Sequence, residues 1–178
     1  MSAPEASGLR KEQLPQINYN PDKVTTTDMW GFAESQETSS VSPEMYEEFI
    51  YPYHKKILDR FGLNCYGCCE PYDLRWKIIK KLPRLRRVSI SPWANLSSLE
   101  ENLGKNYIAS IKPNPAYLAQ STMDEAAVRE NISCSLKTSK NCIPEIIMKD
   151  NHTLGGNPQN AIKWVEIARE EIVRNSEL

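Results

Sequence analysis

The sequence lacks the features that mark membrane-spanning and secreted proteins. No apolar run approaches the roughly 18 residues that a membrane-spanning helix needs. The opening residues, Met1 to Glu5, form neither a basic nor an apolar region, so we expect no signal peptide. The cysteines number five, an odd count that does not suggest a disulfide framework. Together these absences predict a protein of the reducing cytoplasm.

The chain also lacks an excess of charge of either sign. Its 22 Lys and Arg residues are balanced by 23 Asp and Glu residues, for a formal net charge of -1. Proteins dedicated to nucleic acids or anionic membranes carry a basic surplus. The basic stretch from Lys77 to Arg87 belongs to a predicted outer surface, where runs of charge are solvated. We therefore expect neither a nucleic-acid partner nor a membrane.

What the sequence contains is an alternation of short strands and amphipathic helices. Strands are predicted at residues 24–28, 63–66, 86–91, 107–112 and 145–149. This alternation predicts an α/β fold with a parallel sheet of about five βα units. We assign the units to one domain over residues 23–178, which follows an irregular N-terminal arm over residues 1–22.

Capping residues predict where the helices begin and end. Ser42 and Pro43 begin the first helix, Pro52 kinks it and Gly62 ends it. Further helices are predicted at 73–81, from about 95 to 104, at 122–139 behind a capping box that starts at Thr122, and after Asn157. Apolar residues at helical spacing give the first and last helices one apolar face each: Met45, Phe49, Tyr53, Ile57 and Leu58, then Ile162, Val165, Ile167, Ala168 and Ile172.

Candidate functional residues follow the predicted strands, because chemistry in parallel α/β folds collects past the carboxyl ends of strands. Strand by strand, the candidates are Asp28, Trp30 and Gln36; Cys68 and Glu70, just after Tyr66; Trp93; Lys112; and Asp150 with His152. Trp30 and Trp93 could wall a planar ligand, whereas His54 lies mid-helix and is predicted to lie on the surface.

Cys68, Cys69, Glu70, Asp150 and His152 form a candidate metal or nucleophile set. A thiolate, an imidazole and carboxylates could hold zinc with an open coordination position. The alternative is that the cysteines are reduced structural residues, and the neighbouring Cys65 alternates into its strand toward the core.

Several stretches resemble, in the same order, the C-terminal part of proteins of the uroporphyrinogen decarboxylase superfamily. That superfamily also contains cobalamin-dependent methyltransferases. The stretches are Asp28-Met-Trp-Gly-Phe32, Val41-Ser-Pro-Glu-Met-Tyr-Glu-Glu-Phe49 with Pro52-Tyr-His-Lys-Lys56, Leu63-Asn-Cys-Tyr-Gly-Cys-Cys-Glu70, and Ile146-Ile-Met-Lys-Asp-Asn-His-Thr153 followed by Gly155 and Asn157-Pro158. The similarity runs from about residue 20 to 174. It implies a TIM-type (β/α)8 barrel, of which this chain would supply about five units.

The resemblance implies a metal or thiol site with an altered set of ligands. In the methyltransferase branch, zinc is held by a His-x-Cys motif and a later Cys. Here Tyr66 takes the place of that His, Cys68 matches the first Cys, and Asp150 and His152 stand where the later Cys would be. The implied metal ligands are thus Cys68, Glu70 and His152, and Tyr66 could act as a phenolic donor.

Three functional hypotheses follow from the resemblance. The preferred one is corrinoid-linked methyl transfer to or from a small-molecule substrate, with zinc in the site and cobalamin carried on a partner corrinoid protein. Its catalytic residues would be His152, Asp150, Tyr66 and Asp28, and its substrate-binding residues Trp30, Gln36, Trp93 and Lys112. The second is a metal-free decarboxylase or lyase on the same fold. The third is a non-catalytic half-barrel that forms a dimer or needs an N-terminal half-barrel partner.

Overall fold

The computed structural model describes residues 22–149 and 151–176 and contains one parallel sheet. Its strands stand in the order of the chain: β1 (Trp30–Ala33), β2 (Leu63–Tyr66), β3 (Leu85–Ile90), β4 (Ile108–Ile111) and β5 (Ile143–Ile146). All four neighbouring pairs are parallel. The α/β prediction is therefore confirmed. The predicted arm lies outside the described residues except for Asp22.

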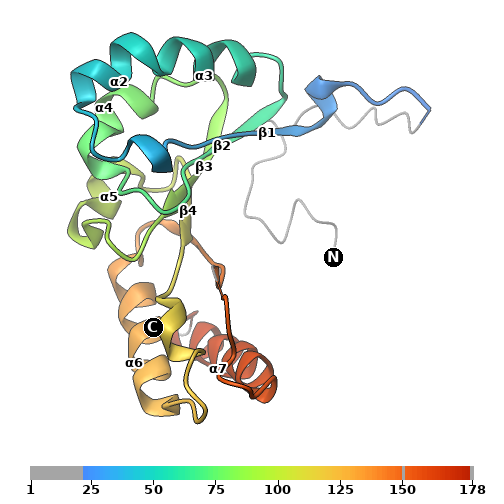
Figure 1. The fold of residues 1–178 in the computed structure, drawn as a ribbon, viewed down its shortest axis with the longest axis vertical. Coiled ribbons are helices and arrows are strands. Elements are labelled where there is room, and N and C mark those ends of the chain that lie inside the picture. The colour runs from blue at the N-terminus through green and yellow to red at the C-terminus, as the bar shows by residue number, and fades with distance from the viewer. Residues whose placement is uncertain (1–21, 150, 177–178) are drawn as a thin grey trace.

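The helices that connect the strands lie on one face of the sheet. They are α2 (Pro43–Phe49), α3 (Tyr51–Leu58), α4 (Trp76–Ile79), α5 (Leu99–Asn102) and α6 (Glu125–Thr138), and α7 (Gln159–Ser176) follows β5. Crossovers between parallel strands are right-handed, so a sheet that adds each strand on the same side places every crossover on the same face. Figure 1 shows α2 to α5 beside β1 to β4, with α6 and α7 below them. None of the described helices is long and apolar enough to cross a bilayer.

Several helix ends form as the sequence predicts. Ser42 caps α2, since its Oγ accepts the Met45 N–H at 3.2 Å. The predicted helix is interrupted at Ile50, between α2 and α3, two residues before the predicted kink at Pro52. Gly62 is not a helix cap, because α3 ends at Leu58 and the Gly62 N–H donates to the Met29 carbonyl at 3.1 Å.

Two further boundaries differ from the prediction. Asp124, not Thr122, caps α6, with its carboxylate accepting the Ala127 N–H at 3.0 Å. The last strand lies at Ile143–Ile146, two to three residues before the predicted 145–149. Ile147, Met148 and Lys149 have long aliphatic side chains, which is why the sequence favours a strand there. In the structure, the Ile147 N–H donates to the Ile111 carbonyl and so extends the hydrogen bonding between β4 and β5 one residue past Ile146.

The predicted first strand at 24–28 is wrong. Thr25 binds the Asp28 carboxylate with both its backbone N–H (2.9 Å) and its hydroxyl (2.8 Å), which closes a 3-10 turn at Thr26–Asp28. Local bonds of this kind compete with pairing in a sheet. The strand starts instead at Trp30, so Asp28 lies before the amino end of β1.

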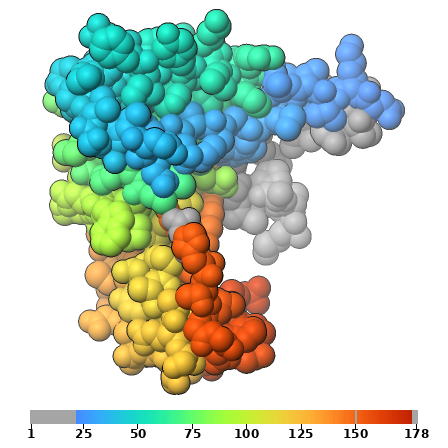
Figure 2. All heavy atoms as spheres, viewed as in Figure 1, coloured from blue at the N-terminus to red at the C-terminus, as the bar shows by residue number. Residues whose placement is uncertain are grey.

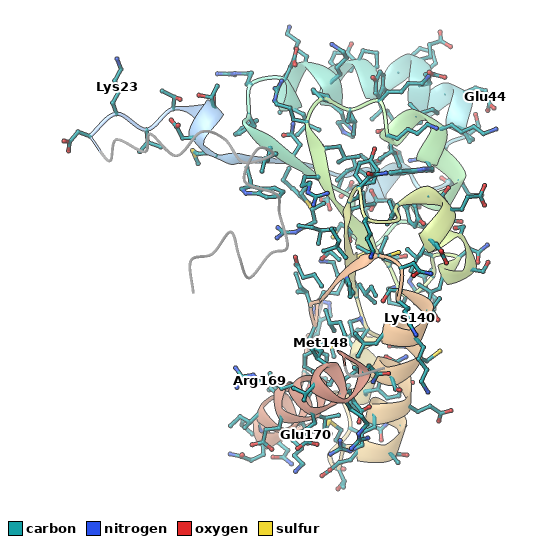
Figure 3. All side chains as sticks on the ribbon, turned by 180° about the vertical axis from the view of Figure 1, so that it is seen from behind. Lys23, Glu44, Lys140, Met148, Arg169 and Glu170 are labelled. Carbon is teal, nitrogen blue, oxygen red and sulfur yellow. The ribbon has the colours of Figure 1, made fainter. Side chains whose placement is uncertain are left out.

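The apolar core has two parts. One lies between the sheet and α2 to α5, where Ala33, Tyr66, Val88 and Ala109 stand side by side in register. Trp76 of α4 is buried in this part of the core. The other part fills the space between α6 and α7, with Val128, Ile132, Trp164, Ile167 and Ala168 buried. Met148, labelled in Figure 3, packs against this second part.

The apolar stripes predicted for the first and last helices lie largely on the surface. Met45, Phe49, Tyr53 and Ile57 are all exposed, and Tyr53 is 68% exposed. In α7, Ile162, Val165 and Ile172 are also exposed, whereas Ile167 and Ala168 are buried. Of the stripe predicted for the first helix, Leu58 is buried against the sheet, and Tyr46, which lies outside that stripe, packs there with it. The helices beside the two edge strands, α2 and α3 after β1 and α7 after β5, thus expose apolar side chains.

The face of the sheet opposite the helices is polar. Phe32, Cys65 and Arg87 stand in register on it, one residue before Ala33, Tyr66 and Val88 of the row that faces the helices. Arg87 pairs with Glu145 at 3.0 Å, and its guanidinium lies 4.8 Å from the centre of the Trp30 ring. Because β1, β3 and β5 are not neighbours, these contacts link alternate strands across this face.

Candidate functional site

The turn after β2, Gly67 to Pro71, carries the candidate thiols. Gly67 has φ of +96°, a conformation that favours glycine, and it lies against Ser89 of β3. The Ser89 hydroxyl donates to the Cys68 carbonyl at 2.9 Å. Cys68 and Cys69 are both half-buried, and their sulfurs are 3.7 Å apart. The sequence therefore places two adjacent thiols at the carboxyl end of a central strand.

Glu70 holds this turn in place through hydrogen bonds from backbone amides. It is only 3% exposed, and its two oxygens accept the Ser35 N–H at 2.7 Å and the Cys68 N–H at 2.9 Å. A carboxylate that accepts buried backbone N–H groups in this way satisfies donors that would otherwise be costly to bury. Glu70 thus ties the carboxyl end of β1 to that of β2, and both its oxygens are engaged in doing so.

Arg75 holds the loop after β1. Its guanidinium is buried and donates to the Ser35 hydroxyl at 3.0 Å, to the Val41 carbonyl at 2.6 Å and to the Thr38 carbonyl. It also lies 4.9 Å from the centre of the Tyr46 ring. One side chain therefore anchors three points of a loop that has no long helix or strand of its own.

An aromatic group lies behind the turn. The rings of Tyr46, His54 and Tyr66 meet edge to face at 5.9 to 6.4 Å, and the Tyr46 hydroxyl and His54 Nδ1 are 3.2 Å apart. The prediction that His54 lies on the surface is wrong, because it points inward from α3 toward this group. Burial lowers the pKa of His54, partly offset by the charge of Glu70. Burial also raises the pKa of Tyr66 far above its usual range, so this phenol stays protonated.

The loop after β5 brings Lys149 to the thiols. Lys149 Nζ donates to Cys69 Sγ. Between β2 and β5 lie three strand spacings of about 4.8 Å, or roughly 14 Å in a flat sheet, which exceeds the combined reach of a lysine and a cysteine side chain. The loops that follow β2 and β5 therefore cover this distance and meet past the carboxyl ends of the strands.

The thiols differ in their surroundings. Burial raises the pKa of Cys65 to about 11, against the opposing effect of Arg87. The pKa of Cys68 rises to about 12 because of burial and because its thiol is hydrogen-bonded to Glu34 and Cys69. Cys65 and Cys68 are therefore held as neutral thiols at neutral pH, while Cys69 faces the Lys149 ammonium.

The two adjacent sulfurs suit a tetrahedral metal, but the rest of the predicted ligand set does not gather round them. Two sulfurs bound at about 2.3 Å to tetrahedral zinc would lie about 3.8 Å apart, close to the separation of Cys68 and Cys69. Among the described residues, no three His, Cys, Asp or Glu side chains lie close enough together to hold a metal ion. Glu70 is already bonded to two backbone amides, and His152 is exposed.

The other predicted residues do not share one edge of the sheet: Asp28 and Trp30 lie at the amino end of β1, whereas Gln36, Trp93 and Lys112 follow the carboxyl ends of their strands. Trp30 begins β1 and contacts Arg87, Gln36 lies in the loop that follows β1, and Lys112 directly follows β4. Trp93 follows β3 and is 71% exposed. Asp150 lies outside the described residues. Their roles stay predictions.

Sequence reasoning assigned no role in this site to Arg75, Glu34 or Lys149. Glu34 and Lys149 could have been assigned one, because Glu34 directly follows β1 and Lys149 stands directly before the two candidates that follow the last strand. Arg75 carries no such signal, since its role depends on tertiary contacts. The cavity of about 270 Å³ beside Leu136, Pro144 and Ile172 lies at the amino end of β5, so it belongs to a different part of the molecule.

In comparisons with known proteins, no family model matches this chain, and none of the curated proteins matches it.

Proposed function

We propose that this chain forms part of a (β/α)8 barrel of the uroporphyrinogen decarboxylase type and carries out thiol chemistry at the carboxyl ends of its strands. Two features support the barrel. The strand order follows the chain with the crossover helices on one face, as in (β/α)8 barrels and unlike doubly wound sheets. The polar face that bears Arg87 and Glu145 would then line the barrel interior.

The reaction we propose is corrinoid-linked methyl transfer that involves a thiol. Cys68 would bind zinc or the thiol substrate, and zinc would supply the positive charge that keeps a thiol deprotonated at neutral pH. Glu70 would position Cys68 through its backbone amide. Trp93 and Lys112 would contact the substrate from neighbouring strand ends, and cobalamin would arrive on a partner corrinoid protein.

One observation carries this proposal: two thiols and a lysine, from strands that are not neighbours, meet at the carboxyl edge of the sheet. This is where barrels of this type place their chemistry.

The test combines zinc analysis with a transfer assay. Purified wild type, Cys68→Ala and the control Cys134→Ala, whose exposed side chain lies on α6, are analysed for zinc and incubated with methylcobalamin and a small thiol. We expect zinc and demethylation of the cobalamin in wild type and in the control, and loss of both in Cys68→Ala. Equal zinc in all three proteins, or none, contradicts the ligand role. No demethylation by zinc-loaded wild type contradicts methyl transfer.

A second candidate function is that of a half-barrel that acts with a partner chain. The exposed apolar stripes on α2–α3 and on α7 favour it, as does the exposure of Phe32 on the edge strand β1. An apolar flank beside an open strand edge is surface that a further βα unit would cover. Sedimentation velocity should then show a dimer or larger assembly that Phe49→Asp weakens and Glu48→Asp, on the same helix, does not. A stable monomer of wild type contradicts this candidate.

A further inference from the structure

A cavity of about 270 Å³ lies at the amino end of β5, at the opposite end of the sheet from the thiols. Its walls come from the last turn of α6 and the turn that follows, from β5 itself and from the last turns of α7. These elements adjoin β5 in the chain, so the cavity forms without any further part of a barrel.

The wall of this cavity is aliphatic. Leu136 of α6, Pro144 of β5 and Ile172 of α7 line it, and no aromatic ring is among the described residues that do so. An apolar cavity of this kind holds water poorly, because it offers water few hydrogen-bond partners. An aliphatic chain would instead bury its own apolar surface there and supply the packing contacts that the wall lacks.

The mouth of the cavity is positively charged. Lys137 and Lys140 line the cavity and are both exposed, so their ammonium groups lie where it opens to water. Lys140 is labelled in Figure 3, just past the end of α6.

The carboxyl end of α6 offsets these charges only in part. Ser139 Oγ donates to the Ser135 carbonyl at 2.8 Å and to the Leu136 carbonyl at 3.3 Å. The Lys140 N–H donates to the Lys137 carbonyl at 3.3 Å. Carbonyls that would otherwise repel an anion are thus occupied, and a helix end carries only about half a unit charge. The two lysines therefore favour a ligand with an anionic group at the mouth.

The volume of the cavity sets the size of its ligand. Ligand pockets commonly measure about 300 to 1,000 Å³, so this cavity suits a molecule smaller than a drug. At about 30 Å³ for each atom the size of a water molecule, 270 Å³ holds roughly nine non-hydrogen atoms. Octanoate matches this size when its chain lies inside and its carboxylate stays at the mouth.

We propose that this cavity binds a medium-chain carboxylate, with the aliphatic chain against Leu136, Pro144 and Ile172 and the carboxylate at Lys137 and Lys140. The inference goes beyond the proposed methyl transfer and does not depend on it. Because the ligand would contact α6, β5 and α7 together, it binds the folded chain and should raise the melting temperature.

The experiment is equilibrium dialysis of the purified chain at pH 7.5 against straight-chain carboxylates from hexanoate to dodecanoate, and against octylammonium as the ligand of opposite charge. The variants are Ile172→Trp, which fills the cavity from an exposed position, and Lys137→Glu, which reverses one charge at the mouth. Their controls are Val173→Trp, one residue further along α7, and Lys56→Glu on α3.

We expect one site per chain, with affinity that rises about fourfold per methylene from hexanoate to octanoate and levels off in longer chains, which exceed the cavity. Octylammonium should bind about tenfold more weakly than octanoate, since two lysines repel it. Ile172→Trp should lower the affinity for octanoate about tenfold, because room for roughly two methylenes is lost. Lys137→Glu should lower it about fivefold, and both controls should leave it unchanged.

Four results would overturn the proposal: no saturable binding by wild type, affinity that keeps rising beyond decanoate, octylammonium that binds as tightly as octanoate, or Ile172→Trp that binds octanoate as well as Val173→Trp does. If Ile172→Trp fails to fold, the chain-length series and Lys137→Glu still decide, since neither alters the core. The dialysis contains no thiol, zinc or cobalamin, so its failure leaves the proposed function standing, and the reverse also holds.

Discussion

Replacing Arg75 with methionine tests whether one buried guanidinium organises the loop that precedes the candidate site. Arg75 is 4% exposed and donates to three acceptors in the loop after β1: the Ser35 hydroxyl and the Thr38 and Val41 carbonyls. Methionine fills much of the same volume but offers no donor. The three acceptors would then have to find water or stay unpaired.

The expected cost follows from these bonds. A hydrogen bond from a charged donor contributes about 1.5–3 kcal/mol, so three bonds set an upper range of roughly 4–9 kcal/mol. Two of the acceptors belong to half-buried residues that water can reach, and removing a buried charge recovers part of its desolvation cost. We therefore expect Arg75→Met to lower the free energy of unfolding by about 3 kcal/mol.

A matched control lies elsewhere in the same chain. Arg84 also donates to three backbone carbonyls, those of Phe61, Asp59 and Leu58, but its side chain is exposed. Because water replaces exposed donors readily, Arg84→Met should cost less than about 1 kcal/mol. Urea unfolding followed by circular dichroism gives both values. Equal losses in the two variants would refute the reasoning that burial decides the worth of these bonds.

Two further predictions concern pH and backbone shape. Burial holds the pKa of His54 below its ordinary 6.5, so the unfolded chain binds a proton more readily than the folded one. The stability contribution of neutral His54 is thus present above about pH 6.5 and is lost as the pH falls through the lowered pKa. His54→Gln should flatten the loss of unfolding free energy between pH 7 and pH 5, and an unchanged slope would count against the burial of this ring. Gly155 and Gly156 both have positive φ, but an added Cβ at Gly155 would overlap the Gln120 carbonyl, whereas one at Gly156 meets nothing. Gly156→Ala should cost about 1 kcal/mol and Gly155→Ala at least about 2 kcal/mol more in the same unfolding assay, and similar costs would contradict the clash.

Strands and caps were predictable where the signal is local. The strand at 63–66, which lies between Gly62 and Gly67, and the Ser42 cap followed from short stretches, because turn glycines and hydroxyl caps act over a few residues. The strand expected at 24–28 failed for the same physical reason, since Thr25 and Asp28 bind each other locally and close a turn.

Contacts between distant elements were not predictable. The stripe from Met45 to Leu58 has the spacing of a packed helix face, yet of its members Leu58 turns inward while Met45, Phe49, Tyr53 and Ile57 are exposed. Tyr46 and His54, which lie outside the stripe, also turn inward. The spacing of apolar residues shows that a helix has an apolar side, but it does not show which side of the helix faces the sheet. The candidate thiols were found by their position after a strand, whereas the lysine beside them depends on where the last strand ends.

The contact between Lys149 and Cys69 has a consequence for folding. Each strand pairs only with its neighbour along the chain, so the sheet can grow in sequence order through connections of 17 to 31 residues. The Cys69–Lys149 contact joins residues 80 positions apart and needs both β2 and β5 in place. Since contacts of such separation form late, the thiol site should be the last part of the molecule to assemble. Helix α6 precedes β5 in the chain and α7 follows it, and both lie in the lower part of the molecule in Figure 2. The folding of this lower part would therefore decide when β5 is in place and the thiol site is complete.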